Sequence, residues 1–215
     1  MPSALLIDLD DTLLDDRGAM AKSVLQFRQK HGLADHVDDD SLVARWDEVG
    51  REVWRKLARG QVTFQEQRRV RLRQVFLLSV ADHEADALFA DYLSFYEENW
   101  ILLPGAEEFL EATAHLPRVI VTNGHRPQAH RKLEKCGLAR KFNGVVTPED
   151  CGVRKPDPKI FMHALNLLGA QAKEALMIGD NLESDIVPAL ALGMQVFHVN
   201  PGESGQSIRY AYSAA

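Results

Sequence analysis

Three carboxylates gather within four positions, directly after the first apolar run of the chain. Ala4–Ile7 is apolar, follows Pro2, and fits a short buried parallel strand better than a helix. Asp8, Asp10 and Asp11 come next, at the carboxyl end of the expected strand, where open α/β sheets place their ligands. Packing alone does not account for them, because unpaired charge near a core is costly. Asp8 and Asp10 fit a site for a divalent cation, which prefers hard oxygen ligands.

Two further polar clusters could serve an anionic group. Thr122, Asn123 and Gly124 offer a hydroxyl, an amide and a backbone N–H that can all donate to a phosphate, although Asn-Gly is also a common turn. Lys155 precedes the rigid segment 156–158 (Pro-Asp-Pro), which cannot lie within a helix and could hold the ammonium in place. A single lysine beside proline is uninformative by itself.

A fourth cluster is again acidic. Gly179 and Asp180 end a later expected strand, and Glu183 and Asp185 follow them. These acids could be metal ligands, or they could be carboxylates favoured by the dipole at the start of a helix.

The elements that would position these clusters alternate between strand and helix after Pro104. We expect strands over residues 118–122, 144–146, 175–178 and 196–199, and helices over 127–136, over 158–168 and up to Leu192. Repeated βα units of this kind imply a doubly wound parallel sheet, Rossmann-like, with right-handed crossovers and helices on both faces. The residues after Pro201 are expected to form a surface extension.

Residues 16–97, between the first two strands, carry only helical spacing. One apolar stripe consists of Leu42, Trp46, Val49, Val53 and Leu57. Thr63 and Glu66 form a capping-box pattern before a helix that should turn Val70, Phe76 and Leu77 inward. We therefore expect an inserted helical bundle over 16–97, with 1–15 and 98–215 as the catalytic core.

The bundle also carries residues that could contact a ligand. Arginines at positions 68, 69, 71 and 73 could bind anions, but a solvated face is the favoured interpretation. Trp46 and Trp54 fit a bundle core better than a platform for stacking bases.

Composition limits the classes of partner. A hydrophobic share of 46% is ample for a packed core, and a formal charge of −6 offers no general footprint for nucleic acid or an acidic membrane. No basic leader and no apolar stretch of membrane-spanning length is evident. Cys136 and Cys151 are expected to be reduced thiols. We expect a cytoplasmic monomer or homodimer without nucleic-acid or membrane partners.

In this order, each at the end of a strand, the four clusters resemble the haloacid dehalogenase (HAD) superfamily, in the branch with a helical cap after the first strand. The first motif is matched by Asp8-Leu-Asp10-Asp11-Thr12, the second by Thr122, the third by Lys155, and the fourth by Gly179-Asp180 with Asp185. The cap is matched by position and helicity only. Pro188 stands where the family often has Gly, which puts no catalytic role in doubt.

This resemblance implies a Mg²⁺-dependent phosphatase that acts on a small phosphorylated metabolite, a nucleoside monophosphate or a sugar phosphate. Asp8 would be the nucleophile that forms an aspartyl-phosphate, and Asp10 the acid and then the base. The family pattern further assigns Mg²⁺ to the Asp8 carboxylate, the Asp10 carbonyl and Asp180, with Asp185 in support or through water. It assigns the phosphoryl charge to Thr122, the backbone of Asn123 and Gly124, and Lys155. The cap would close over the site and choose the leaving group.

Other activities use the same scaffold. Haloacid dehalogenases proper lack an acid at the position of Asp10, since a halide leaves without protonation. A phosphomutase would use the same residues, whereas a receiver-like signalling module fits neither the helical insertion nor the late Gly179-Asp180 cluster. Asp-Asp-Thr with Thr-Asn-Gly is similar to the subset that includes pyrimidine nucleotidases and N-acylneuraminate-9-phosphatases.

Overall fold

The computed structural model describes residues 2–200 and divides the chain into two compact units. The core unit consists of Met1–Asp16 and Trp100–Ala215, and the helical unit consists of Arg17–Asn99. The expected surface extension after Pro201 lies outside the described residues. Within the described residues, no helix is long and apolar enough to span a bilayer.

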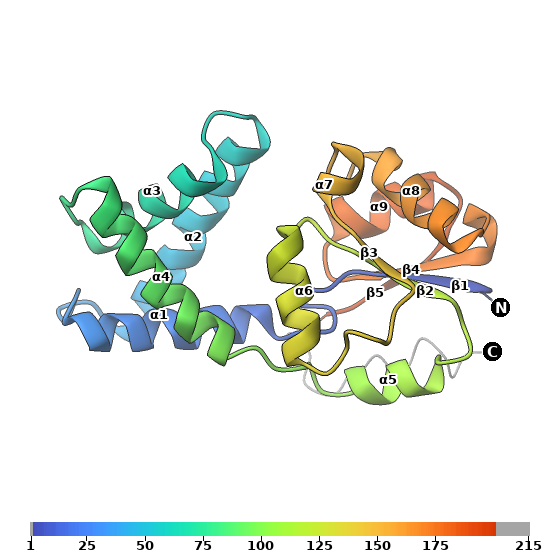
Figure 1. Ribbon diagram of the computed structural model, residues 1–215, viewed down its shortest axis with the longest axis horizontal. Helices are drawn as coiled ribbons and strands as arrows, with labels where there is room; N and C mark the ends of the chain where they lie inside the picture. Colours follow the sequence, from blue (N-terminus) through green and yellow to red (C-terminus); the bar gives the residue numbers. More distant parts are fainter. Residues whose placement is uncertain (1, 201–215) are drawn as a thin grey trace. The chain divides into compact units, whose positions relative to one another are not determined.

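The core unit is built on one parallel sheet of five strands in the order β3-β2-β1-β4-β5 (Figure 1). The strands are β1 (Ala4–Ile7), β2 (Arg118–Val121), β3 (Gly144–Val146), β4 (Ala175–Gly179) and β5 (Gln195–His198). In the register of the central strands, Leu6 of β1 lies between Val119 of β2 and Met177 of β4. The predicted doubly wound α/β fold is confirmed.

Helices cover both faces of the sheet, as expected from right-handed crossovers. They are α5 (Ala106–Ala112), α6 (Arg126–Lys135), α7 (Pro148–Cys151), α8 (Pro158–Leu168) and α9 (Val187–Ala191). Figure 1 shows α8 and α9 on the face opposite α5. Leu6, Val119 and Met177 point to the α8 side, where Ile160 and Phe161 complete a buried apolar cluster. Every residue of β1 is buried, which explains its unbroken apolar sequence.

The strand order reverses beside β1, and this decides where a ligand site can form. From β1 the chain crosses to β2 on one side, whereas β4 pairs with the other edge of β1. At such a switch point the connections leave in opposite directions, and a crevice opens at the carboxyl ends of the strands. Asp8 follows β1 and Asp180 follows β4, so both acids stand at this crevice.

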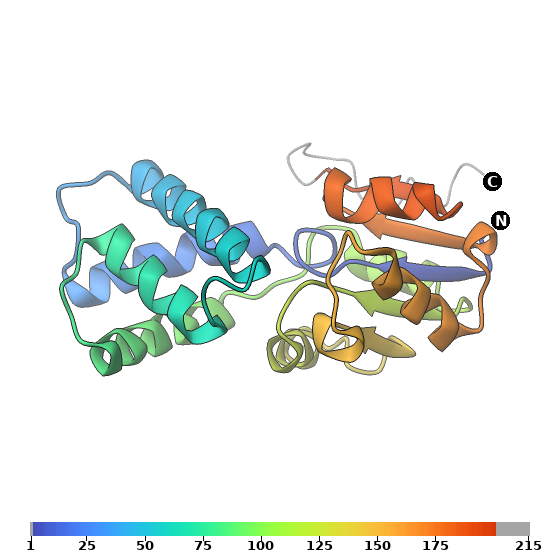
Figure 2. The ribbon, with the colours of Figure 1, turned by 90° about the horizontal axis from the view of Figure 1, so that it is seen from above.

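Four helices form the helical unit as a bundle of their own (Figure 2). They are α1 (Asp16–His31, whose first residue belongs to the core unit), α2 (Asp39–Ala58), α3 (Phe64–Phe76) and α4 (Asp82–Glu98). The fully buried Trp46 ring lies 4.5 Å from the Tyr92 ring centroid and 5.9 Å from that of Phe76. The expectation that Trp46 belongs to the bundle core is confirmed.

The expectation of a solvated arginine face is wrong. The arginines at positions 68, 69, 71 and 73 are all half-buried, and each contacts other groups of the helical unit. Arg69 makes a two-pronged ion pair with Asp86, at 2.6 and 2.7 Å, and a further one with Asp82. Arg73 donates to Asp82 and to the Val80 carbonyl. These contacts tie α3 to the start of α4.

The other two arginines lie against aromatic rings. The Arg71 guanidinium is 4.3 Å from the Trp46 ring centroid, and that of Arg68 is 4.5 Å from the Phe64 centroid. Arg71 also donates to the Trp46 carbonyl. The sequence does not show the pairing of Arg71 with Trp46, because it depends on the packing of α3 against α2, whereas Arg68 and Phe64 lie four residues apart in α3.

The helix α3 begins at the predicted capping box and ends at Phe76, so Leu77 lies just beyond it. Thr63 and Glu66 form the expected capping box, with the Thr63 N–H donating to Glu66 at 2.7 Å and the Glu66 N–H donating to Thr63 at 3.1 Å. Leu77, which was expected to point inward, is 72% exposed and adopts a left-handed conformation with φ of 53°. The correction follows from geometry, since a residue that ends a helix in this conformation leaves the buried stripe.

We predict that Leu77→Gly raises the free energy of unfolding, measured by urea denaturation, by about 0.5–1 kcal/mol. The left-handed conformation costs a residue with a Cβ about 1–2 kcal/mol, which exceeds the backbone entropy that glycine loses. Gln74→Gly, in the same helix but before its end, should instead lower the free energy of unfolding by about 0.5–1 kcal/mol. A destabilised Leu77→Gly variant would show that the exposed leucine contributes packing.

Candidate active site

Asp8 is held at the carboxyl end of β1 by bonds to three separate parts of the core unit. Its N–H donates to the Ile178 carbonyl of β4 at 2.8 Å. Its side chain is 8% exposed, and Oδ1 accepts from the Lys155 ammonium at 2.6 Å. Its Oδ2 accepts from the Thr12 hydroxyl at 3.1 Å. The carboxylate is therefore fixed in direction as well as in place.

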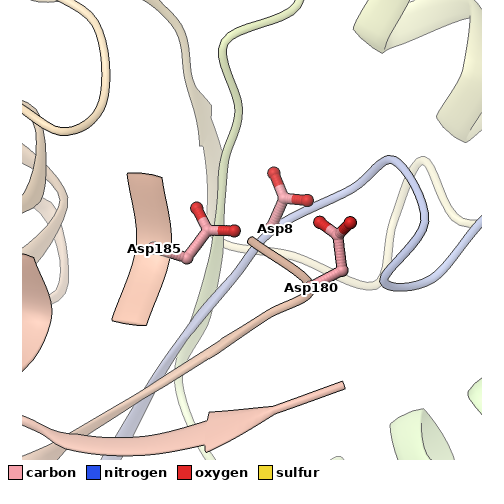
Figure 3. Close-up of side chains that lie close together, drawn as sticks. All are labelled: Asp8, Asp180 and Asp185. Carbon is pink, nitrogen blue, oxygen red and sulfur yellow. The ribbon is translucent and has the colours of Figure 1, made fainter. Parts of the chain in front are cut away.

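Two more carboxylates converge on Asp8. Oxygen atoms of Asp8, Asp180 and Asp185 lie within 4.8 Å of one another, and Figure 3 shows the three side chains around one point. Asp185 lies in a π-helical turn (Leu182–Ile186) between β4 and α9, and it accepts from Lys155 at 2.6 Å and from the Asn181 N–H at 3.1 Å. Glu183 is exposed and does not belong to the cluster.

Gly179 makes room for Asp185. A Cβ at this position would lie 2.5 Å from Asp185 Oδ2 and 2.6 Å from its Cβ, closer than such atoms approach in real proteins. The backbone of β4 can therefore pass the buried carboxylate only because residue 179 has no side chain.

The cluster of carboxylates carries more negative charge than the Lys155 ammonium can neutralise. Burial raises the pKa of Asp8 to about 7, with Asp185 and Asp180 adding to the rise and Lys155 opposing it. Burial acts against the charge of Lys155, but Asp8 and Asp185 outweigh it and raise the lysine pKa. Three carboxylates and one ammonium leave two negative charges when all are ionised. A hard divalent cation such as Mg²⁺ matches both this charge and the all-oxygen donor set.

Asp10 has a different environment from the three clustered acids. Its Oδ1 accepts from the Lys132 ammonium at 2.5 Å, and Lys132 also donates to Asp16 at 2.7 Å. Burial raises the pKa of Asp10 to about 6, against the attraction of Lys132. The Asp10 carboxylate is thus paired with Lys132, so if Asp10 binds a metal, its backbone carbonyl would be the ligand.

The segment after β2 brings the expected anion-binding residues together. Thr122 is buried, and its hydroxyl oxygen accepts from the Gly124 N–H at 3.0 Å, which leaves the hydroxyl hydrogen as a donor. The Asn123 side chain accepts from the Lys155 N–H at 2.8 Å and donates to the Lys155 carbonyl at 3.0 Å. The Asn123 amide therefore positions the backbone of Lys155, a contact between residues 32 positions apart.

Sequence reasoning gave no role to Lys132, Asp16, Thr12 or Gly179. Lys132 had a detectable signal, because it lies at helical spacing with Ala129 and Leu133 on the buried side of α6, where a charge is unexpected. The bond from Thr12 to Asp8 depends on the turn after β1, and no local pattern indicates it.

Comparison with known proteins agrees with this arrangement. A model of the haloacid dehalogenase-like hydrolase family matches residues 2–193. The ribulose-1,5-bisphosphate 5-phosphatase of Halopiger xanaduensis is 30% identical over 220 residues, covering 100% of this chain and 92% of that protein. The phosphoserine phosphatase of Thermus thermophilus is 28% identical over 223 residues, covering 92% and 88%.

A solved structure extends the comparison to the fold. The magnesium-bound HAD-hydrolase YfnB of Bacillus subtilis superposes with a TM-score of 0.80 at 26% identity, covering 94% of this chain and 90% of that one. The chain belongs to the haloacid dehalogenase-like hydrolase family, and the predicted family, fold and enzyme class are confirmed.

We predict that Gly179→Ala displaces Asp185, lowers the free energy of unfolding by about 1–3 kcal/mol, and reduces hydrolase activity. Gly144→Ala in β3 is the matched control. Its added Cβ would lie 3.2 Å from the end of the Leu167 side chain, which is 45% exposed and can move. Urea denaturation and turnover of an aryl phosphate would measure both variants. Equal, small effects would contradict the tight packing of Gly179 on Asp185.

Proposed function

We propose that this hydrolase is a Mg²⁺-dependent phosphatase that cleaves a small phosphate monoester through an aspartyl-phosphate on Asp8. The observation that carries the proposal is the convergence of three carboxylates, those of Asp8, Asp180 and Asp185, at the carboxyl ends of β1 and β4. The Lys155 ammonium is paired with two of them, Asp8 and Asp185. The names of the curated relatives, which include phosphatases of a sugar bisphosphate and of phosphoserine, support a phosphate ester as the substrate.

In the first half of the reaction, an Asp8 oxygen attacks phosphorus and the bond from phosphorus to the ester oxygen breaks. Lys155 and Thr12 hold the carboxylate for this attack. Asp10, in its protonated form, gives its proton to the departing oxygen. The products of this half are the alcohol and the acyl phosphate on Asp8.

The second half restores the enzyme. Asp10, now ionised, takes a proton from a water molecule that attacks phosphorus, and the bond from phosphorus to the Asp8 oxygen breaks. Inorganic phosphate leaves and Asp8 is again a carboxylate. Asp10 therefore needs access to both protonation states, and a pKa of about 6 suits a group that changes state in each turnover.

The residues that would hold Mg²⁺ are Asp8, Asp180 and Asp185, with the Asp10 backbone carbonyl as a further oxygen. The cation, when bound, reduces the repulsion between the Asp8 carboxylate and an anionic phosphoryl group. The charge excess of the acidic cluster supports its binding here.

The remaining negative charge of the phosphoryl group would be neutralised by groups that follow β2 and β3 in the chain. The Thr122 hydroxyl and the Lys155 ammonium are the donors that we assign to the phosphoryl oxygens, with the backbone N–H of Asn123 beside them. The Gly124 N–H already donates to Thr122 Oγ1, so Gly124 would act through that hydroxyl. The Asn123 side chain acts indirectly, because it fixes the Lys155 backbone.

We assign leaving-group selection to the helical unit, as a cap. The donors of the core unit engage only the phosphoryl group, which every candidate substrate shares, so discrimination needs other residues. A nucleoside monophosphate or a sugar phosphate remains the proposed substrate class. Cytoplasmic location, absence of nucleic-acid and membrane partners, and a monomeric or homodimeric state are part of the same proposal.

Asp10 separates this activity from dehalogenation. A halide leaves without a proton, so a dehalogenase has no use for an acid at this position, whereas an alkoxide does. A phosphomutase is the alternative that the same residues permit, since it differs only in whether water or a second substrate hydroxyl accepts the phosphoryl group.

We predict that the purified protein hydrolyses 4-nitrophenyl phosphate with Mg²⁺, loses this activity in excess chelator, and recovers it when Mg²⁺ is restored. Asp180→Asn should raise the Mg²⁺ concentration needed for half-maximal rate, because it removes one anionic ligand. Glu183→Gln is the matched control, since this nearby acid is exposed and outside the cluster. Full activity in excess chelator would contradict the metal requirement.

We predict that Asp8→Asn abolishes turnover and the covalent intermediate, which mass spectrometry of quenched enzyme would detect in the wild type. Asp10→Asn should lower kcat/KM by about 10²–10⁴-fold for phenyl phosphate and by clearly less for 4-nitrophenyl phosphate, whose leaving group needs little protonation. Comparable losses for the two esters would remove Asp10 from the role of acid.

A further inference from the structure

Lys132 is a buried ammonium that the reaction described above does not use. Its side chain is 2% exposed, on the side of α6 that also buries Ala129 and Leu133. A charge in such a place is costly unless it is paired, and pairs of this kind contribute little net stability compared with apolar packing. Its presence is therefore better explained by the groups that it holds than by stability.

The first of these groups is one oxygen of Asp10. Lys132 donates to Asp10 Oδ1 at 2.5 Å, across 122 positions of sequence. The other oxygen, Oδ2, faces the segment after β2, because a Cβ built on Gly124 would lie 3.9 Å from Oδ2 and 3.2 Å from Thr122 Oγ1. Holding Oδ1 thus turns Oδ2 toward the residues assigned to the phosphoryl group.

The second set of contacts lies where the chain passes between its two units. Lys132 donates to Asp16, the last residue of the core unit before the helical unit, at 2.7 Å. Its ammonium is also 5.6 Å from the ring centroid of Trp100, the first residue after the helical unit. One side chain therefore fixes Asp10 relative to both connecting segments.

We propose that Lys132 is a positioning residue for proton transfer, which holds Asp10 Oδ1 so that Oδ2 faces the departing oxygen of the ester. This inference rests on the proposed acid role of Asp10. It predicts that loss of Lys132 impairs the proton transfer itself, and that this impairment disappears when Asp10 can no longer transfer a proton.

The test is a double-mutant cycle of Lys132→Met and Asp10→Asn, read as kcat/KM for phenyl phosphate and 4-nitrophenyl phosphate. Lys132→Met should lower kcat/KM for phenyl phosphate by roughly tenfold or more, a part of the total contribution of general acid catalysis. The loss for 4-nitrophenyl phosphate should be clearly smaller. In the Asp10→Asn background, Lys132→Met should cause no further loss for either ester.

Two further variants guard against effects on folding. Lys132→Met/Asp16→Asn removes one positive and one negative charge together, so Asp10 is not left in a cluster with excess buried charge, and it should show the same leaving-group dependence. Lys135→Met, an exposed lysine of the same helix, should leave both rates unchanged.

The outcomes separate this inference from the function on which it rests. Equal losses for both esters in Lys132→Met and in the charge-balanced variant, or a full additional loss in the Asp10→Asn background, would overturn the positioning role alone. Equal losses for both esters in Asp10→Asn itself would overturn the acid role of Asp10, and the inference with it.

Discussion

The Lys155 ammonium allows two carboxylates to lie buried side by side at the switch point of the sheet. Asp8 and Asp185 are both less than one-tenth exposed, and each accepts from Lys155 at 2.6 Å. Without the Lys155 ammonium the two acids could not both ionise at a buried position, because burial and mutual repulsion favour the neutral form. The position of Lys155 is in turn set by the Asn123 side chain, which donates to the Lys155 carbonyl and accepts from the Lys155 N–H.

The site divides its acids between two buried lysines, and in the mechanism that we propose this division corresponds to two kinds of chemistry. Lys155 holds Asp8 and Asp185, whose neighbour Asp180 completes a cluster with excess negative charge. Lys132 holds Asp10, which stands apart from that cluster. A nucleophile benefits from a fixed, ionised carboxylate. Because burial raises the pKa of Asp8 to about 7 in spite of Lys155, the proposed Mg²⁺ would be needed to keep this carboxylate ionised. An acid, by contrast, must gain and lose a proton. Separate partners let two carboxylates only two residues apart serve different roles.

The sequence predicted the parallel sheet and the convergence of its polar strand ends, because both follow from local signals. Apolar runs such as Ala4–Ile7 specify buried strands, and parallel strands bring their carboxyl ends to one edge. The partners of individual side chains were not predictable in the same way. Arg69 meets Asp86, and Lys132 meets Asp10, only after helices and strands distant in sequence have packed. The predicted inward orientation of Leu77 was wrong for a local reason. The end of a helix can shift by one residue without any change in the apolar pattern.

The path from β4 to α9 shows how the backbone serves the charge cluster. Asp185 reaches the site from a π-helical turn, a rare conformation that is frequent at functional sites. Asn181 caps this turn by accepting the N–H groups of Glu183 and Ser184. Gly179 gives the Asp185 carboxylate its space against the strand. The wider turn, its cap and the missing side chain act together to place one acid beside Asp8 and Lys155. The irregular backbone between β4 and α9 is therefore best explained by the placement of a third carboxylate, that of Asp185, at this edge of the sheet.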